Sequence, residues 1–192
     1  MRSYGVAGCL CGVMLYTEAS FGVGLLWTLA TCCGGCAFAL VWGALQLQRH
    51  GSLALAGDTE PRPPGAPRPA AATLGMLFYP LYAVSFVVFF VVTWINQPLF
   101  PLKTQDLSWC LWWLMTTCFD YYGCCFLYVG VIVSTEPSPA VALAWTLGAL
   151  FVGTPACCAW VVRRLLQHGT LCLAAAVEGK GDGATAGYTR SS

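Results

Sequence analysis

The chain has 192 residues, of which 58% are hydrophobic and only 9% are charged, and its formal net charge is +1. Nine Lys and Arg and eight Asp and Glu side chains cannot cover the surface of a water-soluble domain of this length. A net charge near zero also excludes the basic field of a nucleic-acid-binding protein, so we expect no nucleic acid partner. The composition indicates an integral membrane protein whose main partner is the lipid bilayer.

Four long apolar stretches follow one another along the chain, at residues 20–48, 75–95, 107–134 and 140–166. Each is longer than the roughly 20 residues that an α-helix needs to cross a bilayer. A fifth stretch, residues 4–16, is short for a span and resembles the hydrophobic part of a signal peptide, but no convincing cleavage site follows it. The sequence therefore predicts an all-α, polytopic integral membrane protein with four or five transmembrane helices.

The chain also contains an internal repeat. A shift of 118 positions aligns residues 4–56 with 122–174 without a gap and gives 20 identities over 53 positions. Chance matching at this composition would give roughly 5 identities. The matches include glutamate, tryptophan and histidine residues, among them Glu18 with Glu136, which two similar hydrophobic helices alone do not explain.

The repeat and the apolar pattern divide the chain into a truncated first repeat at 1–56, a proline-rich linker at 57–72, a complete three-helix repeat at 73–174 and a disordered tail at 175–192. The fold is thus predicted to be a partial plus a complete three-helix tandem repeat. The first copy begins in the middle of its second helix, so either the protein is a duplication that has lost half of its first copy or its true start lies upstream of Met1. We favour the second alternative. Two complete copies with three crossings each would have opposite orientations in the membrane.

One acidic side chain, Asp120, falls inside an apolar stretch, where inserting a charge costs about 2.5 to 3.5 kcal/mol. Around it, polar and aromatic residues recur at spacings of three and four, which places them on one face of a helix. The candidate ligand-binding residues of this intramembrane stripe are Trp113, Thr116, Thr117 and Asp120, with Tyr122 at its edge.

Two interpretations of the stripe stay open. It binds a polar or amphipathic ligand, with Asp120 as a proton acceptor or the partner of a cation. Alternatively, a protonated Asp120 is hydrogen-bonded to another helix and holds the helices together.

Four further ionisable residues are secondary candidates. Glu18 and Glu136 follow predicted helices at a membrane edge, where a helix-capping or interfacial role explains them more simply than catalysis. His50 and His168 stand in matched His-Gly pairs, which are typical of a helix C-terminus. A pH-sensing role is the alternative for the two histidines.

Nearly all of the twelve cysteines lie within apolar runs, which favours helix packing over a disulfide framework. Cys33 and Cys36 have the spacing of a redox or metal pair, but no second pair and no histidine cluster accompanies them in the sequence. Nothing in the sequence resembles a nucleotide-binding loop, a nucleophile elbow or a metallohydrolase helix. We therefore expect neither a metal site nor a cofactor.

A series of motifs runs from Leu99-Phe-Pro101 through Trp109, Thr116-Thr117 and Phe119-Asp120-Tyr121 to the Glu136 turn, Trp145 and Gly153. Their order resembles a family of plant and algal multi-pass membrane proteins of unknown function, which is related to a shorter bacterial and cyanobacterial domain. The similarity covers residues 75–168 and, through the repeat, residues 4–50. It implies a multi-pass helical fold, whereas the family has no established activity to transfer.

The leading functional hypothesis is a non-catalytic membrane protein that binds a lipid or isoprenoid-like ligand, or a partner membrane helix, through the Asp120 stripe. In a homo-oligomer, the partner helix would belong to a second copy of this chain. One alternative is a small secondary transporter or proton-coupled carrier. Another is an integral-membrane lipid-modifying enzyme, in which Glu136 or His168 supplies a second catalytic group. The expected location is an integral membrane, with endomembrane and plastid both open.

Overall fold

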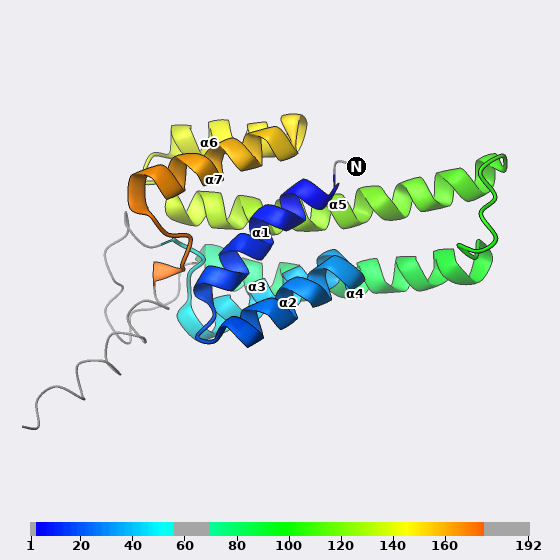
Figure 1. Ribbon diagram of the computed structural model, residues 1–192, viewed down its shortest axis with the longest axis horizontal. Helices are drawn as coiled ribbons and strands as arrows, with labels where there is room; N and C mark the ends of the chain where they lie inside the picture. The colour runs from blue at the N-terminus through cyan, green and yellow to red at the C-terminus, as the bar shows by residue number, and fades with distance from the viewer. Residues whose placement is uncertain (1–2, 56–69, 175–192) are drawn as a thin grey trace, which may run out of the picture.

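The computed structural model describes residues 3–55 and 70–174, of which 82% are helical (Figure 1). The helices are α1 (Ser3–Thr17), α2 (Phe21–Gly34), α3 (Cys36–His50), α4 (Ala70–Asn96), α5 (Leu107–Thr135), α6 (Pro139–Leu147), the π-helical turn η1 (Gly148–Val152) and α7 (Thr154–His168). The all-α prediction is confirmed.

The expected tail at 175–192 lies outside the described residues, as does most of the expected linker. Of that linker, residues 70–72 are described, and they form the first residues of α4.

Two of the described helices, Thr73–Asn96 within α4 and Leu107–Thr135, are long and apolar enough to cross a membrane. The other two long apolar stretches, 20–48 and 140–166, are each divided into two shorter helical segments instead of forming one helix. At 1.5 Å per residue, the 14 residues of α2 and the 15 of α3 extend only about 21 and 22 Å. The expectation of one spanning helix in each of these stretches is therefore wrong.

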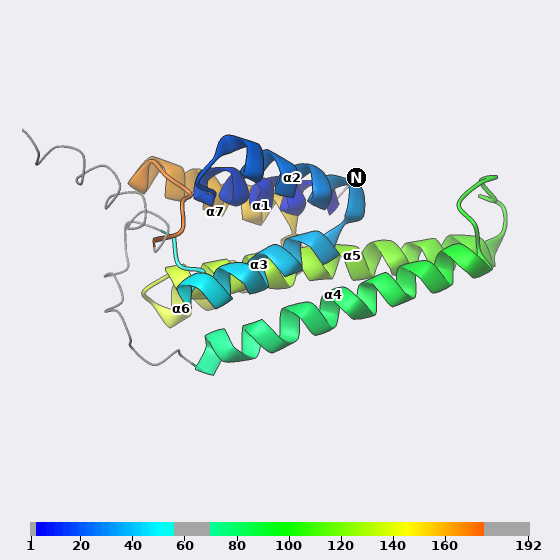
Figure 2. The ribbon, with the colours of Figure 1, turned by 90° about the horizontal axis from the view of Figure 1, so that it is seen from below.

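A glycine with positive φ separates the two arms in both stretches. Gly35 has φ 71° and ψ −156°, and Gly153 has φ 78° and ψ −135°. Side-chain-bearing residues rarely adopt this backbone region. After each glycine the chain turns back, so that α2 with α3, and α6 and η1 with α7, form helical hairpins whose arms spread apart from the turn (Figure 2).

The chain reversals change the expected orientation of the two similar segments. In Figures 1 and 2, α1 and α5 run in the same direction, and so do α3 and α7. Because the stretch 140–166 contributes two antiparallel arms, and α4 and α5 are single helices, the unit from α4 to α7 crosses the molecule four times, which is an even number. The expectation that the two similar segments run in opposite directions is therefore wrong for these helices.

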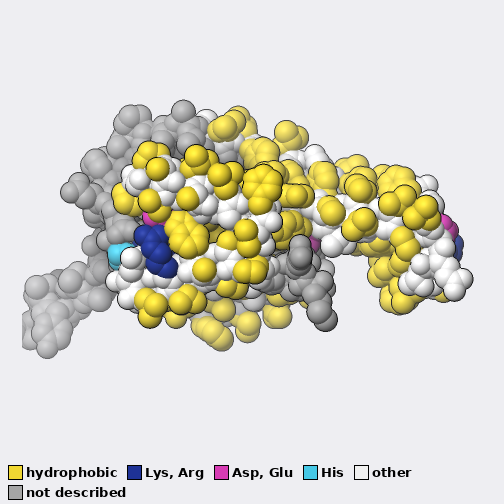
Figure 3. Space-filling model, turned by 90° about the horizontal axis from the view of Figure 1, so that it is seen from above, with side chains coloured by type: hydrophobic (Ala, Val, Ile, Leu, Met, Phe, Trp, Pro, Cys, Tyr) yellow, Lys and Arg dark blue, Asp and Glu magenta, His cyan; other side chains and the backbone are white. Residues whose placement is uncertain are grey.

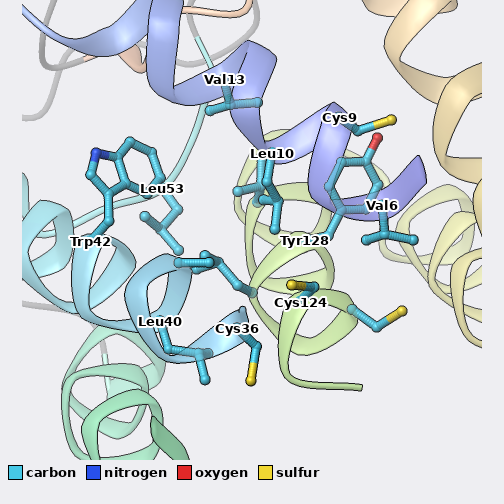
Figure 4. Packing of buried hydrophobic residues seen from close by; sticks show 14 of the residues in the cluster. Val6, Cys9, Leu10, Val13, Cys36, Leu40, Trp42, Leu53, Cys124 and Tyr128 are labelled. Atoms are coloured by element: carbon cyan, nitrogen blue, oxygen red, sulfur yellow. The ribbon is translucent and has the colours of Figure 1, made fainter. Parts of the chain in front are cut away.

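The core lies where α1, α3 and the second half of α5 meet (Figure 4). Val6, Leu10 and Val13 of α1 are fully buried and follow the three- and four-residue spacing of one helix face. Trp42 of α3 and Tyr128 of α5 are also fully buried. Although α1 has only 15 residues, it contacts α2, α5 and α7. The α5 helix contacts α1, α3, α4, α6 and η1, so it is the helix around which the others pack.

The segments that follow α3 and α7 cross each other and bind the opposite half of the chain. Leu55 N–H donates to Thr135 Oγ1 (3.0 Å), and Leu173 N–H donates to Thr17 Oγ1 (3.2 Å). Leu55 and Leu173 are themselves joined by an antiparallel bridge. Both pairs of equivalent residues are 118 positions apart, so the same contact is made twice.

The long helix α4 packs along α3, where the buried Leu40 and Leu47 face inward. A Cβ added at Gly75 of α4 would lie 2.8 Å from Leu47 Cδ1, so the two backbones approach closely there. The positions 118 residues after Leu40 and Leu47 are Cys158, which is exposed, and Leu165, which is half-buried. The packing of the two similar segments therefore differs on this side.

Hydrophobic side chains cover much of the surface. On the face in Figure 3 they occupy the middle, and the Lys, Arg and His side chains in view lie at its two ends. Exposed apolar residues of α4 and α5 include Leu74, Leu77, Leu81, Val88, Ile95, Leu107 and Leu114. A surface this apolar between two polar ends is typical of a protein that is surrounded by lipid.

The hairpin turns can be tested by substitution. Gly35→Ala and Gly153→Ala are each expected to destabilise the fold by about 1–3 kcal/mol, because alanine is strained at a positive φ. The new Cβ at Gly35 would also meet the Asp120 carboxylate. The measurement is thermal unfolding in detergent, followed by circular dichroism.

Gly22→Ala is the matched control, because a Cβ at this helical position has its nearest neighbour at 3.9 Å. Melting temperatures that are equal for Gly35→Ala and Gly22→Ala would contradict the glycine turn between α2 and α3.

Candidate functional site

A cavity of about 520 Å3 lies beside Asp120, between the α2–α3 turn and the helices α1, α4 and α5. Asp120 stands near the middle of α5, 13 residues from its start and 15 from its end, or about 20 Å from each end. The cavity wall is formed by Ala7, Gly8, Thr31, Cys32, Cys33, Gly34, Gly35, Phe86, Val87, Phe90, Trp113, Thr116, Thr117, Asp120 and Cys124. We refer to it as the Asp120 cavity.

Asp120 binds the start of α3 directly. Its Oδ1 accepts a hydrogen bond from the Cys36 N–H at 2.5 Å, and Cys36 is the first residue of α3. The first N–H groups of a helix have no partner within the helix, and the helix dipole places partial positive charge there. Gly35 makes this approach possible, since a Cβ at Gly35 would occupy the place of the carboxylate. The turn between α2 and α3 thus positions the acid at the cavity wall.

Three residues, Phe86, Phe90 and Trp113, form the aromatic part of the wall. The Phe90 and Trp113 rings meet edge to face, with centroids 6.0 Å apart. Trp113 Nε1–H donates to the Gln97 carbonyl oxygen at 3.0 Å, which fixes the orientation of the indole. The Phe90 and Trp113 side chains are therefore held in place by each other and by the α4–α5 connection.

The three threonine hydroxyls of the wall are also bound within the protein. Thr116 Oγ1 donates to the Trp112 carbonyl oxygen, and Thr117 Oγ1 donates to the Trp113 carbonyl oxygen, both at 2.9 Å. Thr31 Oγ1 lies 3.8 Å from Met14 Sδ, to which it donates. These contacts direct the hydroxyl hydrogens away from a ligand. Thr116 Oγ1 also lies 3.1 Å from Thr93 Oγ1, which occupies a further hydrogen-bonding position of this hydroxyl, whereas Thr117 Oγ1 keeps its lone pairs.

The structure brings most of the stripe residues predicted from the sequence together. Asp120, Thr117, Thr116 and Trp113 all line the cavity. Tyr122 does not, because two residues along a helix turn the side chain by about 200°. It is 43% exposed and its ring packs against Tyr121.

The contributions of α1, α2, α4 and the start of α3 to the cavity were not predicted from the sequence. Phe86 and Phe90 come from α4, and nothing in their spacing shows which part of α5 they face. The N-terminus of α3 was missed because residues 20–48 were taken as one helix. The adjacent Gly34 and Gly35 in the middle of that stretch are the signal for the turn.

The secondary candidates Glu18 and Glu136 lie outside the Asp120 cavity and make matching contacts. Glu18 Oε1 accepts from Trp42 Nε1, and Glu136 Oε1 accepts from Trp160 Nε1, both at 2.7 Å. Glu136 also forms an ion pair with Arg163 at 2.9 Å. Both glutamates thus join the end of one helix to a buried tryptophan of another.

Glu136 is too far from Asp120 to share a reaction with it. Both residues belong to α5 or its C-terminal cap and are separated by 16 positions, which corresponds to about 24 Å along the helix axis. A second catalytic group must lie within hydrogen-bond reach of the reacting atoms. The hypothesis that Glu136 completes an enzyme site with Asp120 is therefore wrong.

His50 and His168 end α3 and α7. Gly51 and Gly169 follow them in the left-handed conformation, with φ of 71° and 69°, as expected from the His-Gly pairs. Burial, and then the charge of Arg49, lowers the pKa of His50 below its ordinary value, against the opposing effect of Glu18. His168 belongs to the end of the molecule at which α5 ends (Figure 1), so it is no partner for Asp120.

The cysteines show no grouping that would hold a metal within residues 3–55 and 70–174. Cys33 is exposed, whereas Cys36 is buried beside Asp120. The sulfur atoms of Cys9 and Cys158 lie 3.8 Å apart and join α1 to α7 as thiols.

Comparison with known proteins gives no relative. No family model matches the sequence, and no curated protein or solved structure is significantly similar to it.

The contacts of Glu136 generate a stability prediction. Glu136→Ala is expected to destabilise the protein by about 1–3 kcal/mol, because it leaves the buried Trp160 N–H without its acceptor. The measurement is thermal unfolding in detergent, with the exposed Gln167→Ala as the control. An unchanged melting temperature for Glu136→Ala would contradict a structural role for this glutamate.

Proposed function

We propose that this chain is a multi-pass membrane protein, built from two related halves, that binds an amphipathic lipid or isoprenoid-like molecule in the Asp120 cavity. The observation that carries this proposal is the cavity itself, in which one carboxylate and three threonine hydroxyls stand among aromatic and apolar groups. A ligand with one polar end and an apolar body matches such a wall.

Several features support a location within the membrane. The α4 and α5 helices have the length and apolar composition of spans. The α5 helix begins after Asp106 and ends before Glu136, and this length of about 43 Å approaches the thickness of a bilayer with its headgroups. Asp120 would then stand near the bilayer midplane, where a retained acid is typical of a functional site.

Matching contacts 118 residues apart support two related halves. They include the glycine turns at Gly35 and Gly153 and the Glu–Trp bonds of Glu18 and Glu136. The resemblance to plant and algal multi-pass proteins stays a prediction beside this proposal.

Cavity size favours a small ligand over a partner membrane helix. About 520 Å3 is within the range of small-molecule sites, whereas a helix with its side chains is about 10 Å across. Aromatic rings that are already fixed by contacts within the protein also favour a preformed pocket.

Cross-linking with farnesol that carries a photoactivatable diazirine tests the proposal. We expect labelling of peptides from α4 and α5 in the purified protein. Val87→Phe is expected to reduce this labelling several-fold, because Val87 lines the cavity and the larger ring would fill part of it. Mass spectrometry of the labelled peptides is the measurement.

Val88→Phe is the matched control, because Val88 is exposed on the same helix and does not line the cavity. Equal loss of labelling in both variants, or labelling spread evenly over all apolar helices, would contradict a specific site.

A second candidate, a proton-coupled carrier, is favoured by the position of Asp120 beside the break between α2 and α3. Carriers often place a titratable group where a membrane helix is interrupted near the midplane. The similar halves run in parallel here, which also occurs among transporters.

The carrier hypothesis predicts that proteoliposomes dissipate an imposed pH gradient faster than protein-free vesicles do. Asp120→Asn is expected to abolish the added rate, since an amide cannot take up and release the proton. Asp106→Asn, which changes an acid outside the cavity, is expected to leave it intact. A pH-sensitive dye inside the vesicles reports the rate, and an added rate that Asp120→Asn leaves intact would refute this candidate.

A further inference from the structure

We propose that the Asp120 cavity selects an amphipathic molecule with a positively charged ammonium headgroup. This inference rests on the proposed function and specifies the chemical class of its ligand. Lipid-like molecules with an anionic or a neutral headgroup are the alternatives that the cavity wall disfavours.

The first argument is the supply of hydrogen-bond donors. The strong side-chain donors of the wall are the hydroxyls of three threonines and the indole N–H of Trp113, and each is bound to an acceptor within the protein. The Cys36 N–H is bound to Asp120 as well. A phosphate or carboxylate headgroup needs donors, so this wall offers an anion little stabilisation.

The second argument is the supply of acceptors. Asp120 presents a carboxylate, which has two oxygens and about four lone-pair positions, and Cys36 N–H uses one of them. Thr117 Oγ1, whose hydrogen points to the Trp113 carbonyl oxygen, adds lone pairs one helical turn away. An ammonium group, which carries only donors, complements these acceptors.

The third argument is the charge around Asp120. The part of the cavity wall that the structure describes contains no Lys, Arg or His side chain, and no ion pair to Asp120 is seen there. The α3 N-terminus supplies only a partial positive charge to the carboxylate. A cationic ligand would complete the neutralisation of Asp120 inside an apolar wall, where an uncompensated charge is costly.

The fourth argument is the aromatic wall. Phe86, Phe90 and Trp113 line the same cavity as the carboxylate. The faces of aromatic rings attract cations, and proteins recognise ammonium groups with several rings placed around one position. Acid and rings together therefore favour a cationic over a neutral headgroup of the same size.

Direct binding of three tritiated amphiphiles with the same twelve-carbon chain tests the inference: dodecylammonium, dodecanol and laurate. The immobilised protein is held in a maltoside micelle, which brings no ammonium of its own, and binding is read by scintillation proximity at neutral pH. We expect dodecylammonium to bind about tenfold more tightly than dodecanol, and laurate to bind most weakly because Asp120 repels it.

Two variants assign the preference to the cavity. Asp120→Asn keeps an oxygen that can accept a hydrogen bond from Cys36 N–H. It is expected to lower the affinity for dodecylammonium to that for dodecanol. Phe90→Leu leaves that hydrogen bond in place. Because it removes one ring of the cavity wall, it is expected to reduce, but not abolish, the difference in affinity between dodecylammonium and dodecanol. Asp106→Asn, outside the cavity, is expected to change neither affinity.

The outcomes separate the two levels of the proposal. If dodecanol or laurate binds as tightly as dodecylammonium, and Val87→Phe blocks that binding, the cavity binds amphiphiles and the ammonium inference is overturned. If Asp120→Asn folds and keeps the full preference, the inference is also overturned. If none of the three amphiphiles binds, both the inference and the proposed function fail.

Discussion

The bond between the Asp120 carboxylate and the first N–H of α3 is the contact on which the arrangement of the site depends. It requires a chain reversal at Gly35, because a side chain there would occupy the place of the carboxylate. It also requires that α5 continue past the hairpin, so that an acid from the middle of a long apolar helix reaches a helix end. The result is a charged group that is held by the partial positive charge of a helix terminus while it faces an apolar cavity.

Around this contact, the two halves of the chain hold each other in register. Thr17 and Thr135, near the ends of α1 and α5, each accept an N–H from the segment that follows the last helix of the other half. Two buried tryptophans, Trp42 and Trp160, bond to the glutamates just beyond α1 and α5. These polar contacts lie at one end of the molecule, and the Asp120 cavity lies near the middle of α5. The paired contacts at that end therefore stabilise the packing of the two halves, and they do not involve the residues that line the Asp120 cavity.

Much of the α5 part of the site could be predicted from the sequence. The apolar length of α5 is plain in the sequence, and the three- and four-residue spacing places Trp113, Thr116, Thr117 and Asp120 on one face, because helix geometry is local. Tyr122, which we expected at the edge of this face, stands two residues from Asp120 and does not line the cavity. The hairpins were missed because hydropathy is the same whether an apolar stretch continues or turns back. Only the glycines at 35 and 153, with Pro155 shortly after the second, mark the turns. The contribution of Phe86 and Phe90 depends on how α4 lies against α5, which no local pattern encodes.

Both halves have a glycine turn, but the candidate site lies beside only one of the two turns. The difference follows from the side chain that lies next to each glycine. At Gly35 the neighbour is the Asp120 carboxylate, whereas at Gly153 it is the Tyr121 hydroxyl, 2.5 Å from where a Cβ would stand. A phenol brings no charge to the second turn. In addition, α4 covers α3 and supplies two of the cavity's aromatic rings, while the equivalent positions on α7 are more exposed. Charge and aromatic wall therefore coincide at only one of the two related turns of the described chain. Several polar contacts thus occur in both halves, whereas an acid beside an aromatic wall occurs at one of the two turns.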